Sequence, residues 1–125
     1  MEYSLGVANV FPNFENAVIP IEKFTMYSLN AEREFSKATA FEMALGYTIE
    51  NADKLMENIR HSISDFVAMP KGHNGHGETF ECVMCLMGLN RKQANVLTSW
   101  IIEDGTDFPR LTNCYITKKK ARKPE

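Results

Sequence analysis

The hydrophobic pattern changes its period near residue 77, and this change limits which folds the chain can adopt. Before it, apolar residues recur every three or four positions, as in amphipathic helices that cover a core. After it, apolar and polar residues alternate, as in strands that bury one face. The sequence therefore predicts an α+β fold, in which N-terminal helices pack on one face of a three- to four-stranded antiparallel meander.

Helices are expected near residues 20–29, 35–45 and 52–66. Pro20 suits a first helical turn, because its missing N–H would have no partner there. Gly46 is typical of a helix end, and Asn51 is a good N-cap for the third helix. Strands are expected near residues 78–87, 92–102 and 109–117. The predicted core includes Phe41, Leu45, Leu55, Ile59, Ile63, Val96 and Trp100.

The composition is that of one ordinary domain, with 125 residues, of which 44% are hydrophobic. We expect an irregular lead-in over residues 1–17, a single α+β domain over 18–117 and a basic tail over 118–125. No apolar run is long enough to span a membrane, and no secretory signal is recognisable. Three cysteines do not form a closed disulfide framework. These features predict a reduced, cytoplasmic protein that does not contact membranes.

The tail concentrates positive charge, with five Lys and Arg residues against one acid. Such a cluster can attract phosphate groups, or it can be a solvated chain end that keeps the domain soluble. No aromatic residue is interleaved with these charges, as it would be in a stacking surface for single-stranded nucleic acid. We therefore favour the solvated end.

The segment "KGHNGHGETFECVMC" (residues 71–85) places His73-x-x-His76 before Cys82-x-x-Cys85, which invites a zinc interpretation. Only five residues separate the two pairs, which is short for four ligands that converge on one ion. Cys82 and Cys85 would also point to opposite faces of a strand. We therefore expect no metal site and no cofactor, and we interpret the cysteines as small hydrophobic residues.

Glycines at positions 72, 75 and 77 surround the two histidines, which makes a core position unsuitable for them. Binding and catalytic side chains concentrate on loops held by a rigid scaffold, and histidine can carry protons near neutral pH. A glycine-rich loop can equally be a flexible connector. Both interpretations stay open on the residues alone.

Six short pieces occur in a recognisable order between Val18 and Thr117: "VIPIEKFTMYSLN", "SKATAFEMALGY", "NADKLMENI", "GHGETFECVMCLMGLN", "VLTSWII" and "FPRLTNCYI". Together they resemble an uncharacterised family of small α+β domains at the C-terminal ends of bacterial polymorphic and contact-dependent toxins. The layout is similar to the barnase–EndoU–colicin–RelE group of metal-independent ribonucleases. The chain departs from that pattern at "GLNRKQ", where the family more often has Asn-Gly.

The resemblance implies a ribonuclease toxin that acts on RNA, with tRNA as one candidate, and a cognate immunity or target protein as a further partner. Cleavage of RNA without metal needs a base, a proton donor and a cation for the phosphate. The candidate catalytic residues are His76, Lys37, Arg110 and Thr112. The candidate substrate-binding residues are His73, Lys71 and Tyr115.

If the protein cleaves RNA, we expect His76, Lys37 and Arg110 to converge on one exposed site at the rim of the sheet. The alternative is a non-catalytic protein-binding module, or an inhibitor encoded by a mobile element. The net charge of −2 favours this alternative, because nucleases usually carry positive charge for their substrate.

Overall fold

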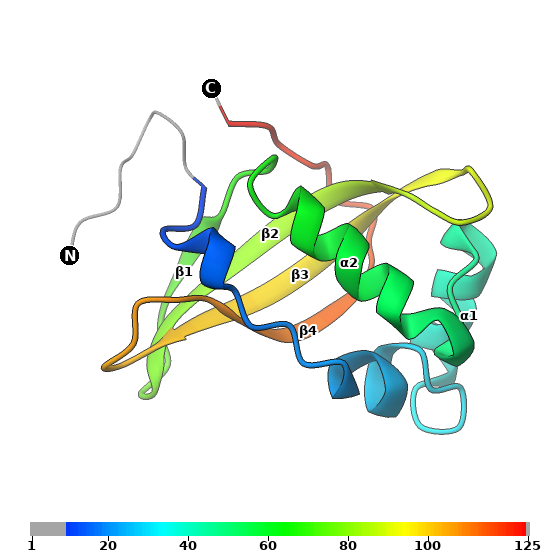
Figure 1. Cartoon of the computed structure of the whole chain (residues 1–125), viewed down its shortest axis with the longest axis horizontal. Coiled ribbons are helices and arrows are strands. Elements are labelled where there is room, and N and C mark those ends of the chain that lie inside the picture. Colours follow the sequence, from blue (N-terminus) through cyan, green and yellow to red (C-terminus); the bar gives the residue numbers. More distant parts are fainter. Residues whose placement is uncertain (1–9, 125) are drawn as a thin grey trace.

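The computed structural model describes residues 10–124, and within them the predicted α+β fold is confirmed. The sheet is an antiparallel meander in the order β1-β2-β3-β4, and α2 crosses one of its faces (Figure 1). Its strands are β1 (Met69–His73), β2 (Gly77–Met87), β3 (Gln93–Glu103) and β4 (Arg110–Ile116). The helices are α1 (Phe35–Leu45) and α2 (Ala52–Ser62), with the short turns η1 (Phe14–Asn16), η2 (Phe24–Ser28) and η3 (Ile49–Asn51).

The core lies between the helices and the face of the sheet that they cover. Along β2, alternate residues from Phe80 to Leu86 are buried, and they pair with β3 residues from Trp100 to Ala94. All seven predicted core residues are at most 1% exposed, so that prediction is confirmed. Cys82 is buried on this face while Cys85 points to the other, as the alternation predicts.

The polar side chain of Thr98 lies inside this core. Thr98 is fully buried, and its hydroxyl donates a hydrogen bond to the carbonyl oxygen of Cys82 at 2.6 Å. The same hydroxyl oxygen accepts the indole N–H of Trp100 at 2.7 Å. Thr98 therefore satisfies the only polar atom of the largest buried side chain.

The opposite side of the sheet, which we call the outer face, is crossed by the C-terminal segment. Lys119 bonds to β3 and β2, because its carbonyl oxygen accepts the side-chain N–H of Asn95 and its ammonium contacts Glu81 at 3.0 Å. Farther on, the carbonyl oxygen of Arg122 accepts the backbone N–H of Val67. Residues 117–122 thus form a strap across the outer face. The backbone of this segment is held by the sheet, while its lysine side chains are exposed to solvent as expected.

Strand β1 was not expected, because residues 69–73 have no alternation and are exposed throughout. The strand tolerates Pro70 because it lies at the edge of the sheet, where a missing N–H costs no ladder bond. The expected glycine-rich loop is consequently a hairpin. Its turn is closed by Asn74, whose side-chain oxygen accepts the backbone N–H groups of His76 and Gly77.

Three other local expectations differ from the structure. The first predicted helix covers residues 22–28 and is π-helical over η2, and α2 ends at Ser62 instead of residue 66. The chain leaves α2 early because Phe66 is buried and Val67 pairs with the strap. Asn51 occupies the predicted N-cap position of α2, but its side chain makes no capping bond there; its side-chain oxygen accepts the N–H of Thr48 and closes the preceding turn η3.

The described part of the lead-in contributes to the core. Phe11 is 1% exposed, and its ring packs against Phe80 and Trp100 with centroid distances of 5.2 and 5.4 Å. Residues 1–9 of the predicted lead-in lie outside the described residues. Between residues 10 and 124, no helix combines the length and the apolar character that crossing a membrane requires.

Replacing Thr98 with Val should lower the free energy of unfolding by about 1–3 kcal/mol, because the buried indole N–H of Trp100 loses its acceptor. Urea unfolding followed by Trp fluorescence measures this change. Thr79→Val is the matched control, since the Thr79 hydroxyl bonds to the Gly72 carbonyl oxygen at an exposed position where water can replace it. Equal losses in both variants would contradict the interpretation.

Candidate functional site

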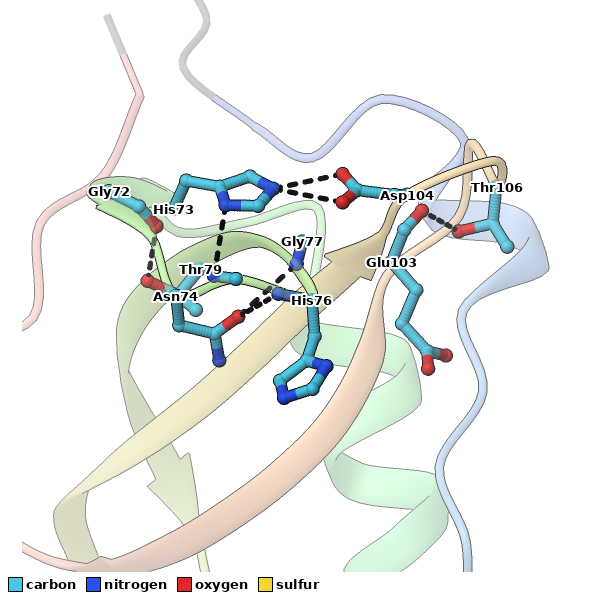
Figure 2. A network of polar contacts seen from close by, with 10 residues as sticks. Gly72, His73, Asn74, His76, Gly77, Thr79, Glu103, Asp104 and Thr106 are labelled. Atoms are coloured by element: carbon cyan, nitrogen blue, oxygen red, sulfur yellow. Dashed lines mark hydrogen bonds and ion pairs between the residues drawn. The ribbon is translucent and has the colours of Figure 1, made fainter.

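Two hairpin turns meet at one end of the sheet, which we call the hairpin end. The pairing of Gly77 with Glu103 places the β1–β2 turn against the β3–β4 turn. The two turns are joined directly, because the backbone N–H of Asp104 donates to the carbonyl oxygen of His76 at 2.9 Å. The histidines predicted to be functional therefore lie beside acidic residues that are distant in sequence (Figure 2).

His73 is held by both of its ring nitrogens. Nε2 lies 3.0 Å from each carboxylate oxygen of Asp104, and Nδ1 lies 3.0 Å from the backbone nitrogen of Gly75. Because the Gly75 N–H needs an acceptor, we assign the neutral ring its hydrogen on Nε2. His73 thus fixes the two turns to each other.

The hydrogen bond with Asp104 raises the pKa of His73 above its ordinary value, while desolvation acts in the opposite direction. Protonation at Nδ1 would remove the acceptor for the Gly75 N–H. The charge-assisted bond to a carboxylate is the stronger of the two contacts, which agrees with the raised pKa.

Beside this pair lie His76, Glu103 and Arg110. The guanidinium Nε of Arg110 contacts the Glu103 carboxylate at 3.1 Å, and both side chains are nearly half exposed. In Figure 2, the His76 ring and the Glu103 carboxylate point the same way, away from the contact between His73 and Asp104. Backbone bonds from Val18 to Pro109 and Leu111 hold Arg110 in place on β4.

The sequence alone did not predict the partner of Arg110. Glu103 is the last residue of β3, and Arg110 is the first residue of β4. Their side chains share a face because Arg110 pairs with Ile101, which lies two residues before Glu103 on β3. Glu103 is therefore an additional candidate for proton transfer.

A second feature lies along β4, where α1 and η2 approach the strand. Here Lys23, Tyr27, Lys37, Ser99, Thr112 and Asn113 line an open groove of about 490 Å³, together with Glu34. We call it the β4 groove. The Lys37 ammonium donates to the Asn113 side-chain oxygen at 3.4 Å, lies 3.5 Å from Glu34, and sits 5.6 Å from the Tyr115 ring centroid.

Two of the predicted site residues, Lys37 and Thr112, line the β4 groove, and a third, Tyr115, lies next to Lys37. A bulge in β4 gives Thr112 no partner of its own in the ladder, and its hydroxyl donates to the Ser99 carbonyl oxygen. The bulge also makes Asn113, instead of Thr112, the residue that shares a face with Arg110.

Residues of η2 and the loop after it extend this surface. The exposed Tyr27 ring has the Lys23 ammonium 5.8 Å and the Arg33 guanidinium 5.4 Å from its centroid. These residues were not among the predicted site residues. Cations around an accessible ring could have been sought in "EKFTMYSLNAER", although the approach to β4 depends on the fold.

The structure does not bring the predicted residues into one cluster. Ser99, in the groove, lies four residues along β3 from Glu103, a separation of about 13 Å in an extended strand. Lys37 therefore meets Asn113 and Tyr115 instead of His76. Lys71 lies at an irregularity of β1, on the edge of the sheet opposite to β4.

The cysteines are unsuited to nucleophilic chemistry. Burial raises the pKa of Cys82 to about 12 and that of Cys114 to about 12, so neither thiol ionises near neutral pH. In the part of the chain that the structure describes, no three His, Cys, Asp or Glu residues are grouped in a way that could hold a metal ion.

A family model described as "Domain of unknown function (DUF6883)" matches residues 10–118. The chain belongs to this family. The match includes every strand, both helices, the hairpin end and the β4 groove, and it stops at the start of the strap. No curated protein and no solved structure matches the chain. The family description includes no activity, so the likeness to toxin ribonucleases stays a prediction.

The pair formed by His73 and Asp104 should make stability depend on pH. Since the pKa of His73 is higher in the folded protein, its contribution is fully present below the ordinary value of 6.5 and is lost as pH rises through the raised pKa. Asp104→Asn should therefore destabilise the protein more at about pH 5.5 than at about pH 8.5. Thermal unfolding at both values measures the difference.

Asp107→Asn is the matched control, because it removes the same charge from the same turn. The difference between the two pH values should also shrink in high salt, which screens an exposed ion pair. An Asp104→Asn effect that is independent of pH would show that the contact contributes no charge-dependent stability.

Proposed function

We propose that the chain is a metal-independent ribonuclease domain of the toxin type, with its chemistry at the hairpin end. The observation that carries this proposal is the contact of Arg110 with Glu103 at 3.1 Å, beside the turn that presents His76. These residues supply a carboxylate, an imidazole and a guanidinium at one rim of the sheet. A base, an acid and a phosphate ligand are what RNA cleavage requires.

The reaction is a transesterification within the RNA strand. The Glu103 carboxylate takes the proton of a 2′-hydroxyl, whose oxygen then attacks the adjacent phosphorus. The bond from phosphorus to the 5′ oxygen breaks, and the protonated His76 gives its proton to the leaving oxygen. Arg110 donates hydrogen bonds to the phosphate as negative charge develops. The products are a 2′,3′-cyclic phosphate and a free 5′-hydroxyl.

The outer face supports a binding path for the rest of the strand. Arg110 and Asn113 share this face, and because of the bulge they pair with Ile101 and Ser99, which are two residues apart on β3, or about 7 Å. Beyond them lie Lys37 and Tyr115, followed by the basic strap. Cations next to accessible aromatic rings bind single-stranded RNA through phosphate contacts and base stacking. This local concentration of cations offsets the overall net charge of −2.

RNA cleavage in the presence of EDTA tests the chemistry. Incubation of the purified protein with total RNA, including tRNA, should release fragments that end in a 2′,3′-cyclic phosphate. His76→Ala and Glu103→Gln should each slow cleavage by about 10²–10⁴-fold, and Arg110→Ala by about 10²-fold. His61→Ala, at an exposed position on α2, is the control and should cleave normally.

Binding is measured separately, in the His76→Ala background, with a fluorescent single-stranded RNA. Lys37→Ala and Tyr115→Ala should each weaken affinity by about tenfold, through loss of a phosphate contact and of a stacking ring respectively. Lys37→Ala should also reduce the slope of log affinity against log salt concentration by about one, because one phosphate contact is lost. Lys54→Ala on α2 is the matched control, because its side chain is exposed on the other side of the sheet.

These experiments separate the two function classes. Intact RNA in the EDTA assay would refute the ribonuclease, whatever the binding results. Retained RNA binding without cleavage would then favour a non-catalytic binding module. If His76→Ala loses cleavage and Glu103→Gln keeps full activity, only the assignment of Glu103 as the base is refuted.

A further inference from the structure

Helix α1 is apolar on two sides, only one of which faces the core. Ala38, Phe41 and Leu45 are buried against the sheet and the neighbouring turns. Phe35 and Met43 project from the helix with 69% and 71% of their surface exposed. A solvent-facing helix surface normally carries polar residues at such positions. The packing of this domain therefore does not explain why the outer side of α1 is apolar.

Phe35 stands at the rim of a groove that is distinct from the β4 groove. One wall is α1, the other is the segment that leads into η3, and the floor consists of the buried residues Leu29, Ala38 and Tyr47. Ile49, on the second wall, is 39% exposed. The volume is about 490 Å³, and the α1 wall runs from Phe35 to Glu42, which is about 10 Å or two helical turns.

The charged residues of this groove all have the same sign. Glu32, Glu42 and Glu50 line it, and none of the described lining residues is Lys or Arg. The groove thus combines an apolar floor with a negative rim, whereas the β4 groove on the other side of α1 contains two lysines. Exposed apolar area of this kind, framed by charges, is typical of a protein-binding surface.

We infer that this α1 groove docks an amphipathic helix of a partner protein, with apolar residues against Phe35 and Ile49 and Lys or Arg residues beside the three glutamates. Two turns of α1 match anchors spaced i, i+3, i+4 and i+7 on such a helix. The carboxylates select a basic partner and steer its approach, while the apolar contacts provide most of the affinity. The surface is independent of the residues proposed to cleave RNA.

The test uses a fluorescent synthetic helical peptide with Leu at i, i+3, i+4 and i+7 and Lys at the flanking positions, and a second peptide with Glu in place of each Lys. The full chain should bind the Lys peptide at least about tenfold more tightly than the Glu peptide. NMR shift changes should map to α1 and to residues 48–50. Phe35→Ser and the double change Glu32→Lys with Glu42→Lys should each weaken Lys-peptide binding by about tenfold or more.

Met87→Ser and Glu57→Lys are the matched controls, since they alter exposed residues of the same types outside the groove. Both should bind like the unaltered protein. Equal affinity for the two peptides would overturn the proposal, as would shift changes on another face. Self-association of the free chain that Phe35→Ser abolishes would also overturn it, because a second copy would then be the occupant.

Discussion

The pairing of β2 with β3 along the whole length of both strands is the constraint on which the other features depend. It sets which residues of the sheet enter the core, because a shift by one position would exchange the two faces. It also brings the β1–β2 turn against the β3–β4 turn, so that His73 meets Asp104 and His76 lies beside Glu103. A Cβ atom on Gly77 would overlap the backbone of Ile102, so this close pairing requires glycine.

The fold also separates charge within a chain whose total is nearly balanced. Cations accumulate along β4 and the strap on the outer face, whereas three glutamates surround the apolar groove on α1. The net charge of −2 indicates neither the cationic surface nor the acidic groove. The net charge favours a non-catalytic binding module over a nuclease, but nucleic-acid binding depends on the local arrangement of charge.

Much of the fold follows from hydrophobic periodicity. Helix α1 begins and ends at the expected residues, because Gly46 adopts the left-handed conformation that ends a helix without strain. The core prediction succeeded because β2 and β3 alternate cleanly. Strand β1 was missed because its exposed residues show no alternation and its pairing with β2 relies on backbone hydrogen bonds. The strap was missed because it is held by bonds to Val67, Glu81 and Asn95, which are distant in sequence.

The site was less accessible to sequence reasoning than the fold. Lys37, Thr112 and Tyr115 do lie together, but the bulge in β4 made Asn113 the central contact of Lys37. Glu103 was missed because its role depends on where a turn returns the chain. An isolated acidic residue at the end of a strand gives no signal until its cross-strand neighbour is known.

Both edges of the sheet are poorly suited to accept another strand. On β1, Pro70 lacks an N–H group and the register is irregular at Lys71. On β4, Val18 already bonds on either side of Arg110, and the bulge interrupts the ladder farther along. Few consecutive N–H and C=O groups therefore remain for an incoming backbone. Recognition of any ligand has to rely on side chains, so specificity can change by single substitutions without altering the sheet.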